Sequence, residues 1–245
     1  MTERGHRDLD RGARHFRVGP SEMRWEDGVL SVEFDERAVP LPVRLRGRLR
    51  LVPHAVNRAP HAIAAGHDWR PVAPTGDVEV EVPGLGISWR GHGYHDTNRG
   101  VEGLEHGFRR WDWSRYGRPG GGATILYDVE SRREEPRTIA LRFARDGSAE
   151  TFEAPPRQPL RRGLWGMKRA VQCDEGSTPR ITGVLEDAPF YTRAKVASRL
   201  MGEDVTGVHE SLDGDRFGSA WVKGLLPFRM PRRAAGDATT NGAAG

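Results

Sequence analysis

Short runs of apolar and β-branched residues recur along this chain and are separated by residues that favour turns. The runs span 29–34, 43–52, 78–82, 87–94, 124–129, 139–143, 149–152, 181–186, 191–196 and 205–212. Turn glycines are expected at Asp27-Gly28, Pro83-Gly84, Asp146-Gly147 and Asp213-Gly214. Alternating runs between such turns are typical of sandwiches and barrels. The chain is therefore predicted to be an all-β protein.

Helices contribute little to this prediction. One short helix is expected at Ala220–Leu225, and 31 Gly with 17 Pro argue against a helical fold. The prolines at 71–74 suggest a boundary between an N-terminal β domain (1–74), with too few strands to close, and a C-terminal β domain (75–233). Residues 234–245 have nothing to bury and are predicted to be a disordered tail.

The charged residues and the single cysteine narrow the classes of function. Only Lys168, Lys195 and Lys223 are lysines, so 35 of the 38 basic residues are arginines, spread along the chain beside acidic residues. No basic patch stands out, which argues against a nucleic-acid partner. Cys173 has no second cysteine with which to form a disulfide or a Cys-rich zinc site, and it fits a reducing compartment.

No segment reads as a membrane span or as a signal sequence. A span needs about 20 apolar residues, which no stretch provides, and the first residues lack an apolar signal core. A soluble, cytoplasmic protein is expected, and any membrane contact is predicted to be peripheral, through a surface patch.

The segment 91–115 concentrates side chains that can carry chemistry. We interpret it as one β-hairpin in which His92, Tyr94 and Asp96 share a face, while Trp111 and Trp113 line up on the following strand. A carboxyl group among aromatic rings is costly to bury, so this pattern indicates a functional site.

A second cluster, 66–71, precedes the proline-rich break. His67 and Trp69 are two residues apart and would point the same way from a strand, so that this pair could meet Tyr94 and Asp96 across a cavity. Alternatives remain open: His67 and Trp69 could be structural, and Asp96 could cap a turn.

Such a group has a definite chemistry. A carboxyl in an aromatic pocket can remain protonated near neutral pH and act as an acid. Aromatic faces stabilise a nearby cation, and a histidine can orient or deprotonate water. Together these suit proton delivery to a carbon atom, followed by capture of a cation by water.

Other kinds of site are less well supported by the sequence. His92, His95, His106 and Asp96 match no zinc motif, so no metal is expected. The glycines at 118–122 lack the Lys-Ser/Thr of a phosphate loop, and Ser211 has no evident base partner for nucleophilic hydrolysis.

Several ordered motifs make the chain similar to a known family. They are Leu45-Arg46-Gly47-Arg48-Leu49-Arg50-Leu51, His67-Asp68-Trp69-Arg70-Pro71, Gly93-Tyr94-His95-Asp96-Thr97-Asn98, Trp111-Asp112-Trp113-Ser114-Arg115, Val208-His209-Glu210-Ser211-Leu212, Trp221-Val222 and the segment 226–233. In this order they resemble the carotenoid 1,2-hydratases, also called hydroxyneurosporene synthases, over nearly the whole chain.

The resemblance implies a fold, a reaction and site residues. The fold would be paired lipocalin-like β-barrels, and the reaction would add water, without a cofactor, across the terminal C1=C2 bond of acyclic carotenoids such as neurosporene and lycopene. The family's catalytic His, Trp, Tyr and Asp match His67, Trp69, Tyr94 and Asp96, with His92, Trp111 and Trp113 expected to contact the substrate.

The resemblance also raises alternatives. Members of the family usually carry an additional upstream region, so the first barrel is expected to be incomplete. This leaves open a misplaced start, a truncated inactive protein or a genuinely short variant. The rival hypotheses are a non-catalytic carotenoid or lipid carrier, and an isomerase or cyclase on the same scaffold.

A bilayer-dwelling substrate suggests where the protein would contact a membrane. That contact is predicted through Leu225, Leu226, Phe228 and Met230 with Arg229, Arg232 and Arg233. The alternative for this segment is a C-terminal strand packed on the barrel.

Overall fold

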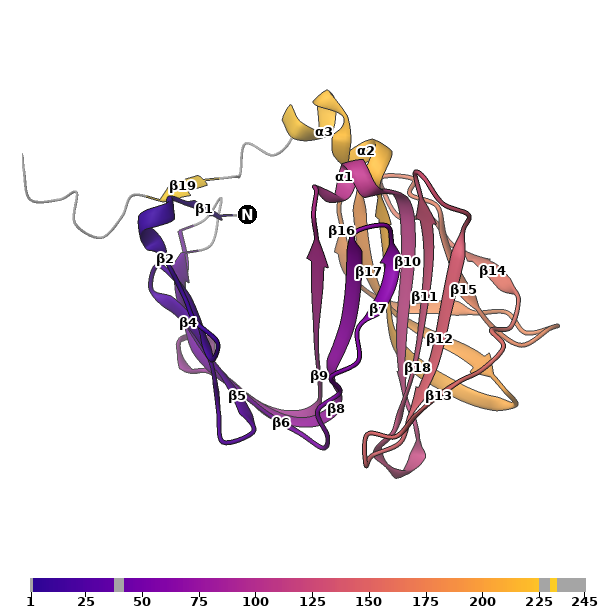
Figure 1. Ribbon diagram of the computed structural model, residues 1–245, viewed down its shortest axis with the longest axis horizontal. Helices are drawn as coiled ribbons and strands as arrows, with labels where there is room; N and C mark the ends of the chain where they lie inside the picture. The colour runs from indigo at the N-terminus through magenta and orange to yellow at the C-terminus, as the bar shows by residue number, and fades with distance from the viewer. Residues whose placement is uncertain (1, 38–41, 225–229, 233–245) are drawn as a thin grey trace, which may run out of the picture. The chain divides into compact units, whose positions relative to one another are not determined.

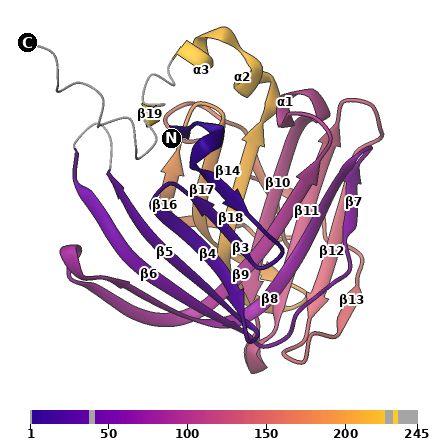
Figure 2. The ribbon, with the colours of Figure 1, turned by 60° about the vertical axis from the view of Figure 1, so that its left-hand side comes forward.

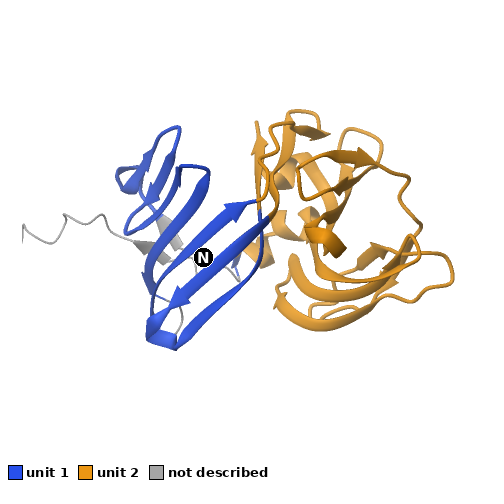
Figure 3. Cartoon of the chain, turned by 90° about the horizontal axis from the view of Figure 1, so that it is seen from below, with its two compact units in different colours: residues 1–53, 76–94, 224–245 blue, residues 54–75, 95–223 orange. Residues whose placement is uncertain are grey.

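The computed structural model describes residues 2–37, 42–224 and 230–232, and its regular structure is mostly strand (Figure 1). The chain divides into two compact units, coloured separately in Figure 3. Unit 1 comprises residues 1–53, 76–94 and 224–245, and unit 2 comprises residues 54–75 and 95–223. The predicted all-β, antiparallel class is confirmed. The units differ from the linear division 1–74 and 75–233, because each takes its residues from separate parts of the chain.

Unit 1 is an antiparallel sheet with strand order β2-β3-β4-β5-β6-β8, in which β4, β5 and β6 lie side by side (Figure 2). Its strands are β2 (Leu9–Arg11), β3 (His15–Val18), β4 (Ser21–Glu26), β5 (Val29–Arg37), β6 (Arg44–Pro53), the later part of β8 (His67–Val82) and the earlier part of β9 (Ile87–Gly100). Two short 3-10 helices, η1 (His6–Asp8) and η2 (Pro83–Leu85), and the parallel pair β1 (Thr2–Arg4) and β19 (Met230–Arg232) complete it. Apolar side chains on one face form its core: Leu30, Leu51, Val78 and Val82.

Unit 2 contains a seven-stranded sheet with order β13-β12-β11-β10-β18-β17-β16, a hairpin β14-β15, and β7 paired with the start of β8. Its strands are β7 (His61–Ala64), β10 (Phe108–Gly117), β11 (Ala123–Ser131), β12 (Arg137–Phe143), β13 (Ala149–Thr151), β14 (Arg157–Leu160), β15 (Arg169–Gln172), β16 (Arg180–Asp187), β17 (Tyr191–Leu200) and β18 (Glu203–Asp213). Its helices are α1 (Leu104–Gly107), η3 (Pro119–Gly121), α2 (Gly214–Gly218) and α3 (Ala220–Gly224).

The two faces of the seven-stranded sheet have different contents. Strand alternation puts Tyr116, Leu126, Ala194 and Val196 into a buried cluster with Leu160 of β14 and Val171 of β15. The opposite face carries Trp111 and Trp113 of β10 and Tyr127 of β11. Trp113 pairs directly with Tyr127 in the register of the two strands.

Some of the predicted turns are present in the structure and others are not. Asp27 and Gly28 both have a positive φ and join β4 to β5 in a two-residue turn, and Gly147 also has a positive φ, both as expected. Asp213-Gly214 is not a glycine turn: Asp213 instead caps α2 by accepting a hydrogen bond from the Arg216 amide. After Pro83 the left-handed residue is Gly86, not Gly84.

Two larger expectations differ in part from the structure. β8 continues from His67 to Val82 through both prolines, so no strand ends at 71–74, but a boundary between the two units lies directly after this segment, at 75/76. The hairpin expected at 91–115 does not form: β9 pairs with β8, and α1 separates it from β10. Both edges of β10 are already hydrogen-bonded, to β11 and to β18, so no edge remains for β9.

At the C-terminal end, the expected helix corresponds to α3 (Ala220–Gly224). Residues 234–245, and 225–229 and 233 of the predicted membrane-contact segment, lie outside the described residues. Met230–Arg232 forms β19 beside β1. Among the described helices, none combines the length and apolar character that a membrane crossing requires.

Candidate functional site

The start of β8 presents His67 and Trp69 on one buried face. Gly66, with φ 72°, allows the tight turn from β7, and β7 then pairs His61 with Trp69. His67 is 3% exposed and Trp69 0%, whereas Asp68 between them is exposed. This alternation is the arrangement expected from their spacing in the sequence.

Trp69 holds Asp96 directly. The indole Nε1–H of Trp69 donates a hydrogen bond of 2.8 Å to Oδ2 of Asp96, which is half-buried on β9. The two residues lie 27 positions apart in sequence, so this contact joins two of the predicted site motifs within unit 2. The carboxyl group is thereby fixed with one oxygen as an acceptor.

His67 is buried beside a charged pair. Its ring meets Phe108 edge-on at a centroid distance of 4.7 Å, and its Nε2 is 3.8 Å from Oε1 of Glu102. Arg133 donates hydrogen bonds of 2.7 and 2.9 Å to the two carboxylate oxygens of Glu102. These bonds hold the pKa of Glu102 below its usual range. Within the described residues, His67 Nε2 has no hydrogen-bond partner, a costly state for a buried nitrogen unless a water or a reactant meets it.

Two glycines make room for the His67 ring. A Cβ at Gly100 would come within 2.4 Å of Nδ1, and a Cβ at Gly107 within 2.6 Å of Nε2. Real Cβ atoms do not approach so closely, so any larger residue at either position would push the imidazole from its place.

A row of aromatic residues extends from Trp69 across the sheet. Tyr127 meets Trp69 edge-on at 5.4 Å and Trp111 at 5.8 Å, and Trp111 in turn lies 6.2 Å from Tyr191. Burial raises the pKa of Tyr127, and the carboxylates of Asp96 and Glu210 raise it further. Its phenol therefore remains neutral at any physiological pH.

The remaining predicted residues are more dispersed. Trp113 is buried on β10, two residues from Trp111. Tyr94, half-buried, is the last residue of unit 1, and His92, exposed, lies two residues before it on β9. Burial lowers the pKa of the neighbouring His95, so its imidazole is neutral at physiological pH.

Sequence reasoning missed Tyr127, Glu102 and Arg133. Tyr127 lies inside the buried run 123–129, where it resembles any core residue. Glu102 and Arg133 lie in loops 31 positions apart, and nothing in either segment indicates that they meet.

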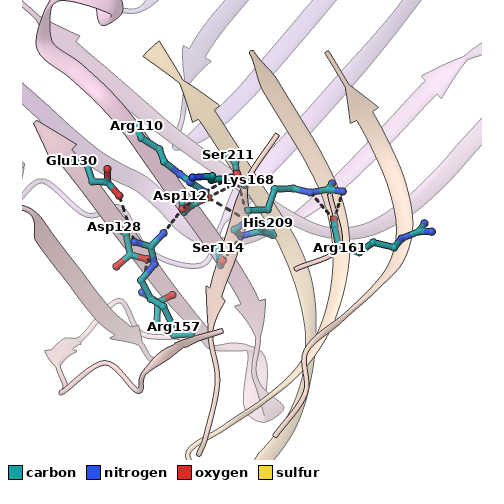
Figure 4. A network of polar contacts seen from close by, with 12 residues as sticks. Arg110, Asp112, Ser114, Asp128, Glu130, Arg157, Arg161, Lys168, His209 and Ser211 are labelled. Atoms are coloured by element: carbon teal, nitrogen blue, oxygen red, sulfur yellow. Dashed lines mark hydrogen bonds and ion pairs between the residues drawn. The ribbon is translucent and has the colours of Figure 1, made fainter. Parts of the chain in front are cut away.

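A second polar cluster occupies the other face of the sheet (Figure 4). Ser114 Oγ lies 2.9 Å from His209 Nδ1, His209 Nε2 lies 3.1 Å from Ser211 Oγ, and Ser211 donates to Asp112. Ser211 thus has a histidine neighbour on the same face of β18, but its hydroxyl hydrogen points to Asp112, so His209 is not a base partner for it.

This second cluster nevertheless has the character of a structural network. Its four side chains are 0–2% exposed, so a reactant has no access to them. Asp112 also forms ion pairs with Arg110 of its own strand and with Arg157 of β14. The Ser211 hydroxyl donates its hydrogen bond to the Asp112 carboxylate, and its oxygen accepts one from His209 Nε2. Through the ion pair between Arg157 and Asp112, the network holds the β14-β15 hairpin against the sheet.

Unit 1 contains a separate hollow of about 700 Å³ whose lining includes Phe34, Arg46 and Gly47 but none of the predicted site residues. The ion pairs Arg44–Asp35 and Arg48–Glu81 lie in its wall. So charged a lining does not fit an apolar ligand.

Comparisons with known proteins agree with the motifs. The family described as carotenoid hydratase CrtC matches residues 1–239. Proteins named acyclic carotenoid 1,2-hydratase are 46% identical in Thiocapsa roseopersicina, over 95% of this chain, and 44% identical in Rubrivivax gelatinosus, over 96%. The chain spans 58% of the length of each of these two relatives. The Rhodobacter capsulatus protein of the same name is 38% identical over 96% of this chain and 84% of its own length.

The fold has a solved counterpart. A crystal structure assigned to AttH from Nitrosomonas europaea superposes with a TM-score of 0.57 over 82% of this chain and 70% of its own, at 14% identity. That likeness concerns the fold alone, which is lipocalin-like.

Proposed function

Because the chain belongs to the carotenoid hydratase CrtC family, we propose that it hydrates the terminal C1=C2 double bond of acyclic carotenoids such as neurosporene and lycopene. The product is a tertiary 1-hydroxy carotenoid, and no cofactor takes part. The observation that carries this proposal is the hydrogen bond from the buried Trp69 indole to the Asp96 carboxyl, beside an aromatic wall that suits an apolar chain.

Asp96 supplies the proton in this mechanism. Its Oδ2 accepts from Trp69, so the transferable hydrogen belongs on Oδ1. Transfer of that proton to C2 leaves a tertiary cation at C1, which the π-face of Trp69 stabilises. Tyr94, two residues before Asp96 on β9, is assigned to the same role. His92, Trp111 and Trp113 are assigned to contacts with the polyene.

His67 handles the water. The buried Nε2 without a partner is the atom that accepts a proton as the water oxygen bonds to C1. The carboxylate of Glu102, 3.8 Å away, stabilises the imidazolium that forms. The proton returns through solvent to Asp96, so nothing is oxidised or reduced and the net change is the addition of one water.

The decisive experiment incubates the protein with lycopene and analyses the pigments by mass spectrometry. We expect 1-hydroxylycopene, heavier by one water. Binding without a product would support the carrier hypothesis, and a product of unchanged mass would support an isomerase or cyclase.

The substitution Asp96→Asn tests whether Asp96 is the acid that supplies the proton. The amide keeps the shape but has no acidic proton, so the rate should fall by at least about a hundredfold. Asp68→Asn is the matched control, because Asp68 is exposed on the same region of β8 and points away from Trp69. Hydration by Asp96→Asn at the control's rate would remove Asp96 from the mechanism.

A further inference from the structure

The loop between β14 and β15 presents apolar side chains at the tip of a tight turn. The amide of Gly166 bonds to the carbonyl of Gly163 at 3.0 Å, which leaves Leu164 and Trp165 at the two central positions. We call residues 163–166 the Leu-Trp turn. Leu164 is 96% exposed and Trp165 42%. Gly, Pro, Asn, Asp and Ser usually occupy such positions, so an adjacent Leu and Trp need an explanation.

The Leu-Trp turn is held in place from several sides. The Leu164 amide donates to Asp187 at 2.8 Å, and Arg216 donates to the carbonyl of Trp165 at 2.7 Å. Met167, directly after the turn, is 1% exposed and anchors the loop in unit 2. The two apolar side chains are thus displayed by a fixed backbone.

A second tryptophan enlarges this apolar tip. Trp221 of α3 is 50% exposed, and its ring centroid lies 6.3 Å from that of Trp165. Helices α1, α2 and α3 gather at one end of unit 2 (Figure 1), and α1 ends at Gly107, which packs against His67. The tip therefore lies beside helices that adjoin the candidate site.

Positive charge flanks the tip. Arg161 and Arg162 precede the turn and Lys168 follows it, all three exposed, and the segment 161–168 contains no acidic residue. Lys223 of α3 adds a further exposed cation, 3.8 Å from Glu105.

We propose that the Leu-Trp turn, with Trp221 and the flanking cations, docks unit 2 onto an anionic phospholipid bilayer. Tryptophan favours the interface between head groups and acyl chains, leucine inserts below it, and arginine and lysine pair with lipid phosphates. A second copy of the chain fits less well, because it would bring the exposed Arg161, Arg162 and Lys168 of two turns together. This surface is independent of the hydration chemistry and is distinct from the segment 225–233.

Vesicle flotation without any carotenoid tests the proposal on the full chain. Phosphatidylcholine vesicles containing phosphatidylglycerol should carry the protein upward, whereas pure phosphatidylcholine should carry much less. Leu164→Ser with Trp165→Ser should weaken binding by at least about tenfold, given the apolar area that two such side chains bury. Arg161→Gln and Arg162→Gln should each weaken it by about fivefold at low salt.

The matched control is Leu85→Ser with Trp89→Ser, which removes the same residue types, each 48% exposed, from unit 1. It should bind vesicles as the unaltered chain does, and circular dichroism should show all variants folded. Equal binding by both double variants would overturn the proposal. So would a dimer in size-exclusion chromatography that only the Leu164/Trp165 variant dissociates. Loss of hydration activity would not affect this test, since turnover is not measured.

Discussion

Glu102 is the acidic residue nearest to the reactive nitrogen of His67, and Arg133 keeps it there. A histidine that takes a proton from water gains charge in a buried pocket, where an opposing carboxylate has a large effect. In the proposed mechanism, Glu102 is thus a positioning residue that acts through His67.

Glu102→Gln should therefore lower the hydration rate by about tenfold to a hundredfold, because it removes the charge and loosens the imidazole while keeping the side-chain shape. Steady-state kinetics with lycopene should show the loss in kcat more than in KM. Glu150→Gln is the control, since Glu150 forms an exposed ion pair with Arg142 on β12-β13. Equal rates for the two variants would contradict the role of Glu102.

Residue types and spacing predicted which single residues to consider for chemistry. His67, Trp69 and Asp96 stood out because polar and aromatic side chains recurred two apart, and Trp69 does contact Asp96. Tyr127, Glu102 and Arg133 could not be found in this way. Their importance arises from long-range contacts that depend on how the strands pair.

At the scale of the elements, α1 and β10 fix how much space His67 has. Gly107, at the junction of α1 and β10, is buried against the imidazole, whereas a Cβ added to Gly117 at the other end of β10 would meet nothing within 4 Å. The same substitution at the two ends of β10 should therefore have different effects.

Gly107→Ala should destabilise the fold by about 1–3 kcal/mol, because its methyl group would overlap His67 Nε2. It should also reduce hydration. Gly117→Ala should change the free energy of unfolding by about 0.5 kcal/mol or less. Urea titration of both variants measures the difference, and a similar value for the two would show that the pocket can relax around the added methyl.

Most strands could be predicted from alternating apolar residues, as in β5, β6, β11 and β18. Which strands pair with one another could not be predicted in this way. The sequence 91–115 favoured a hairpin because its strands are adjacent, yet β10 lies between β11 and β18. Prolines at 71 and 74 suggested a break that β8 does not have, and β2, β3 and β4 were too short and charged to stand out.

For the whole molecule, the buried network of unit 2 links stability to pH. Burial, together with Arg169, Arg110 and Arg157, lowers the pKa of His209 to about 3. In the unfolded chain the imidazole has a pKa of about 6.5, so between these values only the unfolded state binds the proton. His209 therefore contributes stability above pH 6.5 that is lost as the pH falls toward 3.

The free energy of unfolding should decrease by about 2 kcal/mol from pH 7.5 to 5 through His209 alone. Burial raises the pKa of Asp112, which acts in the opposite direction by favouring the folded state at low pH. Comparison with His209→Gln separates the two effects, because only the histidine contribution disappears. Urea unfolding at both pH values is the measurement, and parallel profiles for the two proteins would refute the assignment.

The crossing of β8 and β9 from one unit to the other governs how this protein can be recombined with its relatives. A chimera joined at one point inside 54–223 would give each unit segments of mixed parentage, since unit 1 takes residues from both ends of the chain and unit 2 takes residues from both sides of 76–94. Exchange of a whole unit requires seams at 53/54, 75/76, 94/95 and 223/224 together. Gene shuffling that ignores these seams should yield mostly insoluble proteins, and a library built on them should be enriched in folded ones.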